Sequence, residues 1–264
     1  MEYSRHNIQW NGTSFFFHVL QDHGAKEIHN LHDIEYVENS LLMIIAPNSN
    51  FSDESIRAYK NFVKNGNTLF IACEAENANQ LLKGIGSNLH ILSGNLVSVD
   101  IEFNDPGSII AFTLNENDTL LNNISTIILN KPSAVIGGTP LVNTSILSWM
   151  DMDSDFVADV DEPLKEYSIV SKEYVGGGVI YVLSDPSIFI NSMQNIGVDN
   201  TYFIENIIAK SQYILVDQVY SKTADTTGVS HIIHTIKNSP HYRMFVIIIT
   251  IFIMLSLFYL SKKL

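Results

Sequence analysis

The chain has 264 residues, 46% of them hydrophobic and 16% charged, and its formal net charge is -13. The apolar fraction is enough for a folded core and excludes an intrinsically disordered chain. The acidic balance leaves no basic surface to neutralise phosphates, so we expect no nucleic-acid partner. Cys73 is the only cysteine, which excludes an internal disulfide framework and a zinc site made of several cysteines.

Two elements are expected before residue 40. An amphipathic run with Phe16, Val19 and Leu20 on one side follows residues 11–14 and is stopped by Gly24, which predicts a first helix. Residues 27–31 are expected to form the first strand.

Residues 41–74 read as strand, helix and strand. Residues 41–46 and 68–72 are nearly continuous apolar runs, as in strands buried on both faces of a parallel sheet. Between them Ser52 can cap a helix whose apolar residues recur at three- and four-residue steps, and Gly66 suits its C-terminal cap. The stretch therefore predicts a right-handed crossover at the centre of the sheet.

The next part of the chain is rich in short strands. Residues 77–83 are expected to form a short helix, and residues 97–103 alternate apolar and polar side chains like a half-exposed strand. Further β-prone pieces follow at 109–112, 126–129 and 134–136. We interpret residues 89–150 or so as a β-rich insertion on one side of the sheet.

A hairpin is predicted from residues 167–172 and 179–183, joined by the glycine turn at 176–178. Asp199 and Asn200 are expected to cap a helix over 201–211, and residues 213–219 to form a last edge strand. Together these elements predict an α/β domain over residues 1–220, with a flavodoxin-like or amidotransferase-like, mostly parallel sheet.

The C-terminal part has a different composition. Residues 221–240 are polar and are expected to be a linker, and residues 241–264 to form a transmembrane helix with a short basic tail. The uncharged stretch begins at Met244 and ends at Leu260, which gives roughly 25 Å of helix at about 1.5 Å per residue. A hydrocarbon core is ~30 Å thick, and flanking residues can snorkel. The sequence thus predicts a single-pass anchor in the cell membrane, with the lipid bilayer as a partner.

Cys73 is expected at the carboxyl end of a central strand, where open parallel sheets bind ligands and display nucleophiles. The element order resembles class I glutamine-amidotransferase-like cysteine hydrolases. However, Ala72 and Glu74 replace the glycines that a nucleophile elbow needs, and Glu74 tends to raise the pKa of the thiol. We interpret Cys73 as a packed apolar residue, with a cysteine hydrolase or amidotransferase as the alternative.

The same edge of the sheet predicts a crevice between strand ends. Its candidate residues are Pro47, Asn48, Ser52, Cys73, Glu74, Ser184, Asp185 and Asn191. No catalytic residue is assigned apart from the weak candidate Cys73, and no cofactor is expected.

An acidic run resembles a calcium loop. Carboxylates occupy its first, third, fifth, ninth and twelfth positions, as Asp151, Asp153, Asp155, Asp159 and Glu162. Phe156 stands at the sixth position, where the loop calls for glycine, and Pro163 interrupts the helix that should follow. A calcium site and a solvated acidic loop both stay open.

Several segments carry a family resemblance: Tyr3-Ser4-Arg5, Trp10-Asn11-Gly12-Thr13-Ser14, Asn65-Gly66-Asn67-Thr68-Leu69, Ser148-Trp149, Ser184 to Asn191, and Asp199-Asn200. They resemble an archaeal and bacterial membrane-protein family of unknown function, family 4350, with an amidotransferase-like domain. Its members are often encoded beside MoxR-type AAA+ ATPases. The resemblance implies a domain outside the cytoplasm.

On these grounds we predict a membrane-anchored, non-enzymatic interaction or accessory domain of an envelope or MoxR-associated complex. The alternatives are the Cys73 hydrolase and an ectodomain that binds calcium or a small ligand.

Overall fold

The computed structural model describes residues 2–48, 50–114, 117–194, 196–224 and 244. The chain divides into a compact unit, Met1–Ala224, and a second unit, Asp225–Leu264, of which only Met244 is described.

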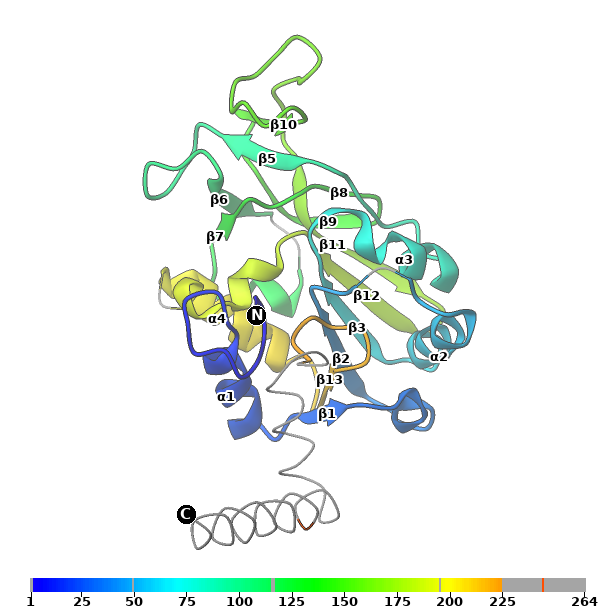
Figure 1. Ribbon diagram of the computed structural model, residues 1–264. Coiled ribbons are helices and arrows are strands. Elements are labelled where there is room, and N and C mark those ends of the chain that lie inside the picture. Colours follow the sequence, from blue (N-terminus) through cyan, green and yellow to red (C-terminus); the bar gives the residue numbers. More distant parts are fainter. Residues whose placement is uncertain (1, 49, 115–116, 195, 225–243, 245–264) are drawn as a thin grey trace, which may run out of the picture. The chain divides into compact units, whose positions relative to one another are not determined.

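One large sheet runs through this unit (Figure 1). Its strands are β1 (Lys26–Ile28), β2 (Ser40–Ile45), β3 (Thr68–Ala72), β6 (Ser108–Thr113), β7 (Thr126–Asn130), β9 (Thr139–Asn143), β11 (Ser168–Val175), β12 (Gly178–Leu183) and β13 (Tyr213–Asp217). They lie side by side in the order β1-β13-β2-β3-β12-β11-β9-β6-β7.

The sheet has a parallel half and an antiparallel half. The pairings from β1 through β13, β2 and β3 to β12 are parallel. Those from β12 through β11, β9 and β6 to β7 are antiparallel. The predicted mostly parallel, flavodoxin-like sheet is therefore wrong. β9, β6 and β7, which were expected in an insertion on one side, instead extend the main sheet from the hairpin strand β11. Their local sequence pattern does not specify which strand they pair with.

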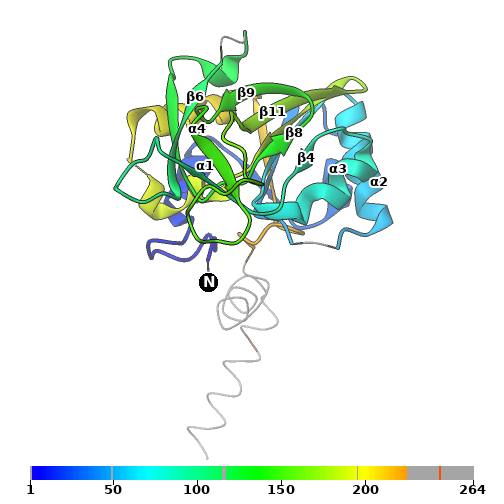
Figure 2. The same cartoon turned by 90° about the horizontal axis from the view of Figure 1, so that it is seen from above.

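Helices cover both faces of the sheet (Figures 1 and 2). The α-helices are α1 (Ser14–Asp22), α2 (Asp53–Lys64), α3 (Asn79–Ile85) and α4 (Val198–Ile208). The short 3-10 helices are η1 (Leu31–Ile34), η2 (Ala75–Ala78), η3 (Thr119–Leu121), η4 (Pro186–Phe189) and η5 (Asn191–Met193). α1 and α4 lie on one face, and α2 and α3 lie on the other.

Each face has its own apolar core. Under α1 and α4, Phe16 packs against Phe189 with ring centroids 4.5 Å apart, and Phe203 is buried beside them. Under α2 and α3 the core includes Tyr59 and Phe62. The amphipathic patterns that predicted α1 and α2 are confirmed, as is the cap of α2, where the Ser52 side chain accepts from Ser55 N.

Two small antiparallel sheets complete the unit. β5 (Asn95–Ser98) pairs with β10 (Ser148–Asp151), and β4 (His90–Ile91) pairs with β8 (Val135–Ile136). The strand predicted over 97–103 was expected to be longer. β5 ends at Ser98, and Phe103 has a left-handed backbone with φ of 58°, which an extended strand cannot contain.

The end of the unit also differs from expectation. β13 was predicted at an edge, but it lies between β1 and β2. Residues 221–224, predicted as linker, pack on the domain: Lys222 N donates to Ala46 O at 3.2 Å. The rest of the predicted linker lies outside the described residues.

The predicted fold class also included a C-terminal transmembrane helix, and that part is not supported. Within the described ranges, no helix combines the length and the apolar character that crossing a membrane requires. Apart from Met244, the stretch that carried this prediction lies outside those ranges.

Candidate functional site

Cys73 lies directly after β3, at the carboxyl end predicted from the sequence, but its side chain is buried. Its backbone N–H donates to Leu183 O at 2.9 Å, and Sγ donates to Glu74 O at 3.2 Å. Burial raises the pKa of the thiol to about 12. The thiolate that a nucleophile requires is therefore disfavoured at neutral pH.

The carboxyl end of β2 is covered by the last segment of the first unit, residues 217–224. Asn48 N donates to Tyr220 O at 2.9 Å, and Ile45 N donates to Ser221 Oγ at 3.1 Å. Pro47 forms an isolated antiparallel bridge with the same segment. Pro47 and Asn48 therefore help to attach residues 217–224 to the sheet.

The carboxylates of Glu74 and Asp185 both act electrostatically on the phenol of Tyr3. Burial and these two carboxylates raise the pKa of Tyr3. The ammonium of Lys222 lies 3.9 Å from Glu74 Oε1 and 6.0 Å from the centroid of the Tyr3 ring. This part of the predicted crevice thus contains a polar cluster made with the N-terminal segment, in which the side chains of Glu74 and Lys222 are partly exposed.

The predicted residues directly before η4, Ser184 and Asp185, have structural partners. Asp185 accepts from Ser187 N and from Asn130 N, both at 2.7 Å, and burial raises its pKa to about 6. Ser184 Oγ donates to Ser133 O at 2.7 Å. These side chains bind neighbouring backbone, which makes them supports of the fold.

Asn191 fastens the N-terminal loop instead of facing a ligand. Its Nδ2 donates to Gln9 O at 2.7 Å, and its Oδ1 accepts from Phe15 N at 3.0 Å. Ser52 is on the other side of the sheet, at the start of α2. The structure therefore does not gather the eight predicted crevice residues into one site.

Asp199 and Asn200 cover the outer edge of β7. Thr126 N donates to Asp199 Oδ2 at 3.1 Å, while Asn200 accepts from Ile128 N at 2.8 Å and donates to Ile128 O at 2.9 Å. The prediction that they cap α4 from outside is wrong, because α4 already begins at Val198. Their side chains saturate an edge strand that could otherwise pair with another chain.

The acidic loop does bring its carboxylates together. One carboxylate oxygen from each of Asp151, Asp153 and Asp155 lies within 4.8 Å of the others. Desolvation and the neighbouring carboxylates raise the pKa of Asp153. Hard carboxylate oxygens in a small volume are the donor set that Ca²⁺ prefers.

The backbone of this loop bends as a calcium loop requires. Asp151 accepts from Ser154 N at 2.7 Å and from Phe156 N at 3.3 Å. Phe156 has φ of 64°, the left-handed conformation that glycine normally supplies at this position. The absence of glycine at the sixth position therefore does not prevent the loop from bending.

Glu162, the twelfth residue, is turned back onto the loop. It is 6% exposed, and its carboxylate accepts from Met152 N at 2.6 Å and from Asp159 N at 3.4 Å. The fold therefore keeps the last acidic residue of the pattern beside the first three.

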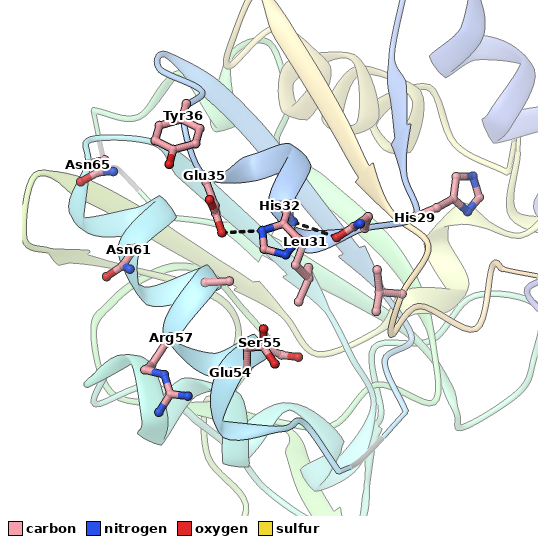
Figure 3. Close-up of a pocket in the computed structure, with 13 residues that line it drawn as sticks. His29, Leu31, His32, Glu35, Tyr36, Glu54, Ser55, Arg57, Asn61 and Asn65 are labelled. Atoms are coloured by element: carbon pink, nitrogen blue, oxygen red, sulfur yellow. Dashed lines mark hydrogen bonds and ion pairs between the residues drawn. The ribbon is translucent and has the colours of Figure 1, made fainter.

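A separate surface cavity of about 780 Å³ lies between η1 and α2 (Figure 3). Its walls include His29, His32, Glu35, Tyr36, Glu54, Arg57, Asn61 and Asn65. His32 Nδ1 lies 2.8 Å from Glu35 Oε1. The sequence pattern does not reveal this cavity, because the polar residues of α2 that line it are those of any exposed helix face.

A buried charge cluster was also missed. Asp118 accepts from Lys172 Nζ at 3.1 Å, from Tyr181 OH at 2.9 Å and from Lys210 Nζ. Desolvation opposes ionisation, but hydrogen bonds from Lys210, Leu120 N and Lys172 lower the pKa of Asp118 to about 2. The partners are up to 92 residues apart in sequence, so no local pattern could reveal them.

Residues 5–208 match the family model described as "Domain of unknown function (DUF4350)". The chain belongs to the DUF4350 family. This confirms the family membership that the resemblance implies, but not its amidotransferase-like domain, MoxR-type neighbours or membrane anchor.

Solved structures resemble the DUF4350 domain at low identity. The mmIFT52 N-terminal domain has a TM-score of 0.51 at 14% identity, over 68% of this chain and 78% of that one. A putative ThuA-like protein from Bacteroides uniformis has a TM-score of 0.46 at 12% identity, over 75% and 81%. Cytoplasmic protein STM1381 from Salmonella typhimurium LT2 has 0.48 at 9%, over 76% and 87%. The first likeness shows a shared fold alone, and the other two are too weak to argue from.

Among curated proteins, none matches the chain. For this DUF4350 domain, the family and the fold therefore come from comparison, whereas any function has to be argued from its own residues.

Proposed function

We propose that this DUF4350 domain is a non-enzymatic interaction domain of an envelope complex. The observation that carries the proposal is the gathering of exposed apolar side chains on the loop after β10, which projects away from the sheet (Figure 1). Large exposed apolar patches on a soluble domain mark interaction sites more often than chance.

The state of Cys73 supports a non-enzymatic role over the hydrolase alternative. Its thiol is buried, its pKa is raised to about 12, and its sulfur donates to the neighbouring carbonyl. Reactive cysteines are partly exposed and have lowered pKa values.

The nature of the complex is proposed from the family resemblance, which suggests a MoxR-type ATPase among the partners. The test is a pull-down with the tagged full chain from native membranes, followed by mass spectrometry. Recovery of an envelope protein or of the ATPase is expected, and recovery of neither would overturn the proposal. A bilayer partner and a location at the cell membrane stay predictions.

A second candidate function, calcium binding by residues 151–162, is favoured by a specific observation. Three carboxylates converge within 4.8 Å on a loop whose sixth residue has the required left-handed backbone. Such sites in extracellular modules bind Ca²⁺ with dissociation constants of about 10⁻⁴ to 10⁻³ M.

Calorimetric titration of the full chain with Ca²⁺ tests this candidate. Asp153→Asn removes one of the three converging carboxylates and is expected to weaken Ca²⁺ binding about tenfold. Asp161→Asn is the matched control, because it removes the same charge from an exposed residue outside the ligand pattern. Equal losses in the two variants, or no heat with the natural chain, would rule out a calcium loop.

A further inference from the structure

Several exposed apolar residues of the domain lie close together in sequence, on the loop that follows β10. We call residues 146–166 the acidic tip. Its side chains include Val160 at 102% exposed, Met152 at 63%, Val157 at 59% and Leu164 at 53%. Single exposed apolar residues are ordinary, so what matters is whether these form one surface.

Hydrogen bonds hold the parts of the acidic tip together. Lys165 N donates to Ser148 O at 3.0 Å, which places Leu164 beside the start of β10. Met152 N donates to the carboxylate of Glu162 at 2.6 Å, so the outgoing and returning arms of the loop are joined. Exposed apolar residues of both arms therefore belong to one small surface.

The charge of this surface is one-sided. Seven acidic residues and a single lysine lie between residues 146 and 166. Two of the acidic residues, Asp151 and Glu162, are buried, and the other five are exposed. That lysine, Lys165, has its ammonium 4.8 Å from the centroid of the Tyr167 ring. A partner must therefore supply positive charge as well as apolar surface, and anionic lipids and nucleic acids would be repelled.

We propose that the acidic tip binds a cationic amphipathic helix of a partner protein. Such a helix presents an apolar stripe bordered by lysine or arginine, which complements exposed apolar side chains interleaved with carboxylates. The inference rests on the proposed interaction function and names the chemistry of the partner at this surface.

The test uses a defined probe. A fluorescent peptide of about 18 residues, made of leucine and lysine at helical spacing, is titrated with the full chain in EDTA, so that calcium plays no part. We expect micromolar binding, roughly 10⁻⁶ to 10⁻⁵ M. A peptide of the same composition with its amphipathic order scrambled is the matched control. Equal binding of the two peptides would show that only their net positive charge matters, and it would overturn the proposal.

Two variants separate the contributions of the surface. Val157→Ser/Val160→Ser/Leu164→Ser keeps every charge, and Asp159→Asn/Asp161→Asn keeps every apolar side chain. Each is expected to weaken peptide binding about tenfold. Because most of these side chains are exposed, an unchanged melting temperature should accompany the loss. Full binding by the serine variant would overturn the proposal.

The same serine variant distinguishes this inference from the proposed function. If the natural chain recovers an envelope partner and the serine variant recovers it equally well, the acidic tip is not the docking surface, although the interaction function stands. If the natural chain recovers none, the interaction function fails whatever the peptide does.

Discussion

Asp118 shows how much a single residue can stabilise this fold. Its carboxylate is the common acceptor for two lysines and a tyrosine, and all of these side chains are largely buried. Removing one partner of a buried ion pair leaves an uncompensated charge, which costs far more than the pair contributes.

We therefore predict that Asp118→Asn lowers the free energy of unfolding by about 3–5 kcal/mol. Urea denaturation of the natural chain and the variant measures the difference. Asp161→Asn, which removes an exposed carboxylate, should change stability by less than about 0.5 kcal/mol. A similar small change in Asp118→Asn would show that the lysines find other partners.

The same carboxylate predicts an acid-sensitive step. The pKa of Asp118 falls from its ordinary 3.8 to about 2, so the unfolded state takes up the proton first as the pH drops. The stabilisation is present above about pH 4 and is lost between about pH 4 and 2. Stability curves against pH should converge for the natural chain and Asp118→Asn over this window, and parallel curves would contradict the assignment.

Phe156 shows that residue type alone does not determine backbone conformation. Phe156 stands where a calcium loop normally has glycine, and its residue type therefore argues against a calcium site. Its backbone nevertheless adopts the left-handed conformation that glycine usually supplies. Residue type gives a preference for a conformation, whereas the surrounding loop decides whether that preference is overridden.

Among the elements, α4 supplies a protective cover for the outer edge of the sheet. Asn200 makes two hydrogen bonds to Ile128 in β7, in the place where another strand would bind. We predict that Asn200→Ala lowers stability by about 1–3 kcal/mol, because the part-buried backbone amide and carbonyl of Ile128 lose their partners.

Exposure of this edge should also promote association. Size-exclusion chromatography at increasing concentration measures it, with Glu205→Ala, an exposed change on the same helix, as the control. A stable, monomeric Asn200→Ala protein would mean that water replaces the lost contacts.

The glycine turn between β11 and β12 has a packing role beyond the predicted hairpin. A Cβ on Gly178 would lie 2.2 Å from Val63 O and 2.3 Å from Asn67 O, both in rigid backbone around the end of α2. Gly178→Ala should therefore cost about 1–3 kcal/mol or more, measured by thermal unfolding. Gly177→Ala is the neighbouring control, since its Cβ would lie no closer than 3.1 Å, to Lys64 O. Equal losses in the two variants would mean that the backbone conformation of the turn, and not the contact at Gly178, is responsible.

The elements with strong local signals were predictable, whereas their pairing was not. The cap at Ser52, the apolar stripe of α2 and the buried strands on either side are set by neighbouring residues. Nothing local distinguishes an edge strand from an interior one when both are apolar, so β13 was misplaced.

For the whole molecule, the family and the mixed sheet are established. The proposed function is argued from exposed side chains. The acidic run was visible in the sequence, but its apolar component became meaningful only when the loop was seen to project from the sheet (Figure 1). The cavity beside α2 and the Asp118 cluster depend on distant residues that only folding brings together.

The position of β13 between β1 and β2 affects how the chain is made. During synthesis, β1 and β2 leave the ribosome roughly 170 to 185 residues before β13, the strand that pairs with both. Until then both present unpaired backbone, and the contact that closes the parallel half has a very long sequence separation. A nascent chain released before residue 213 would therefore expose two open strand edges, which makes premature termination a direct route to aggregation.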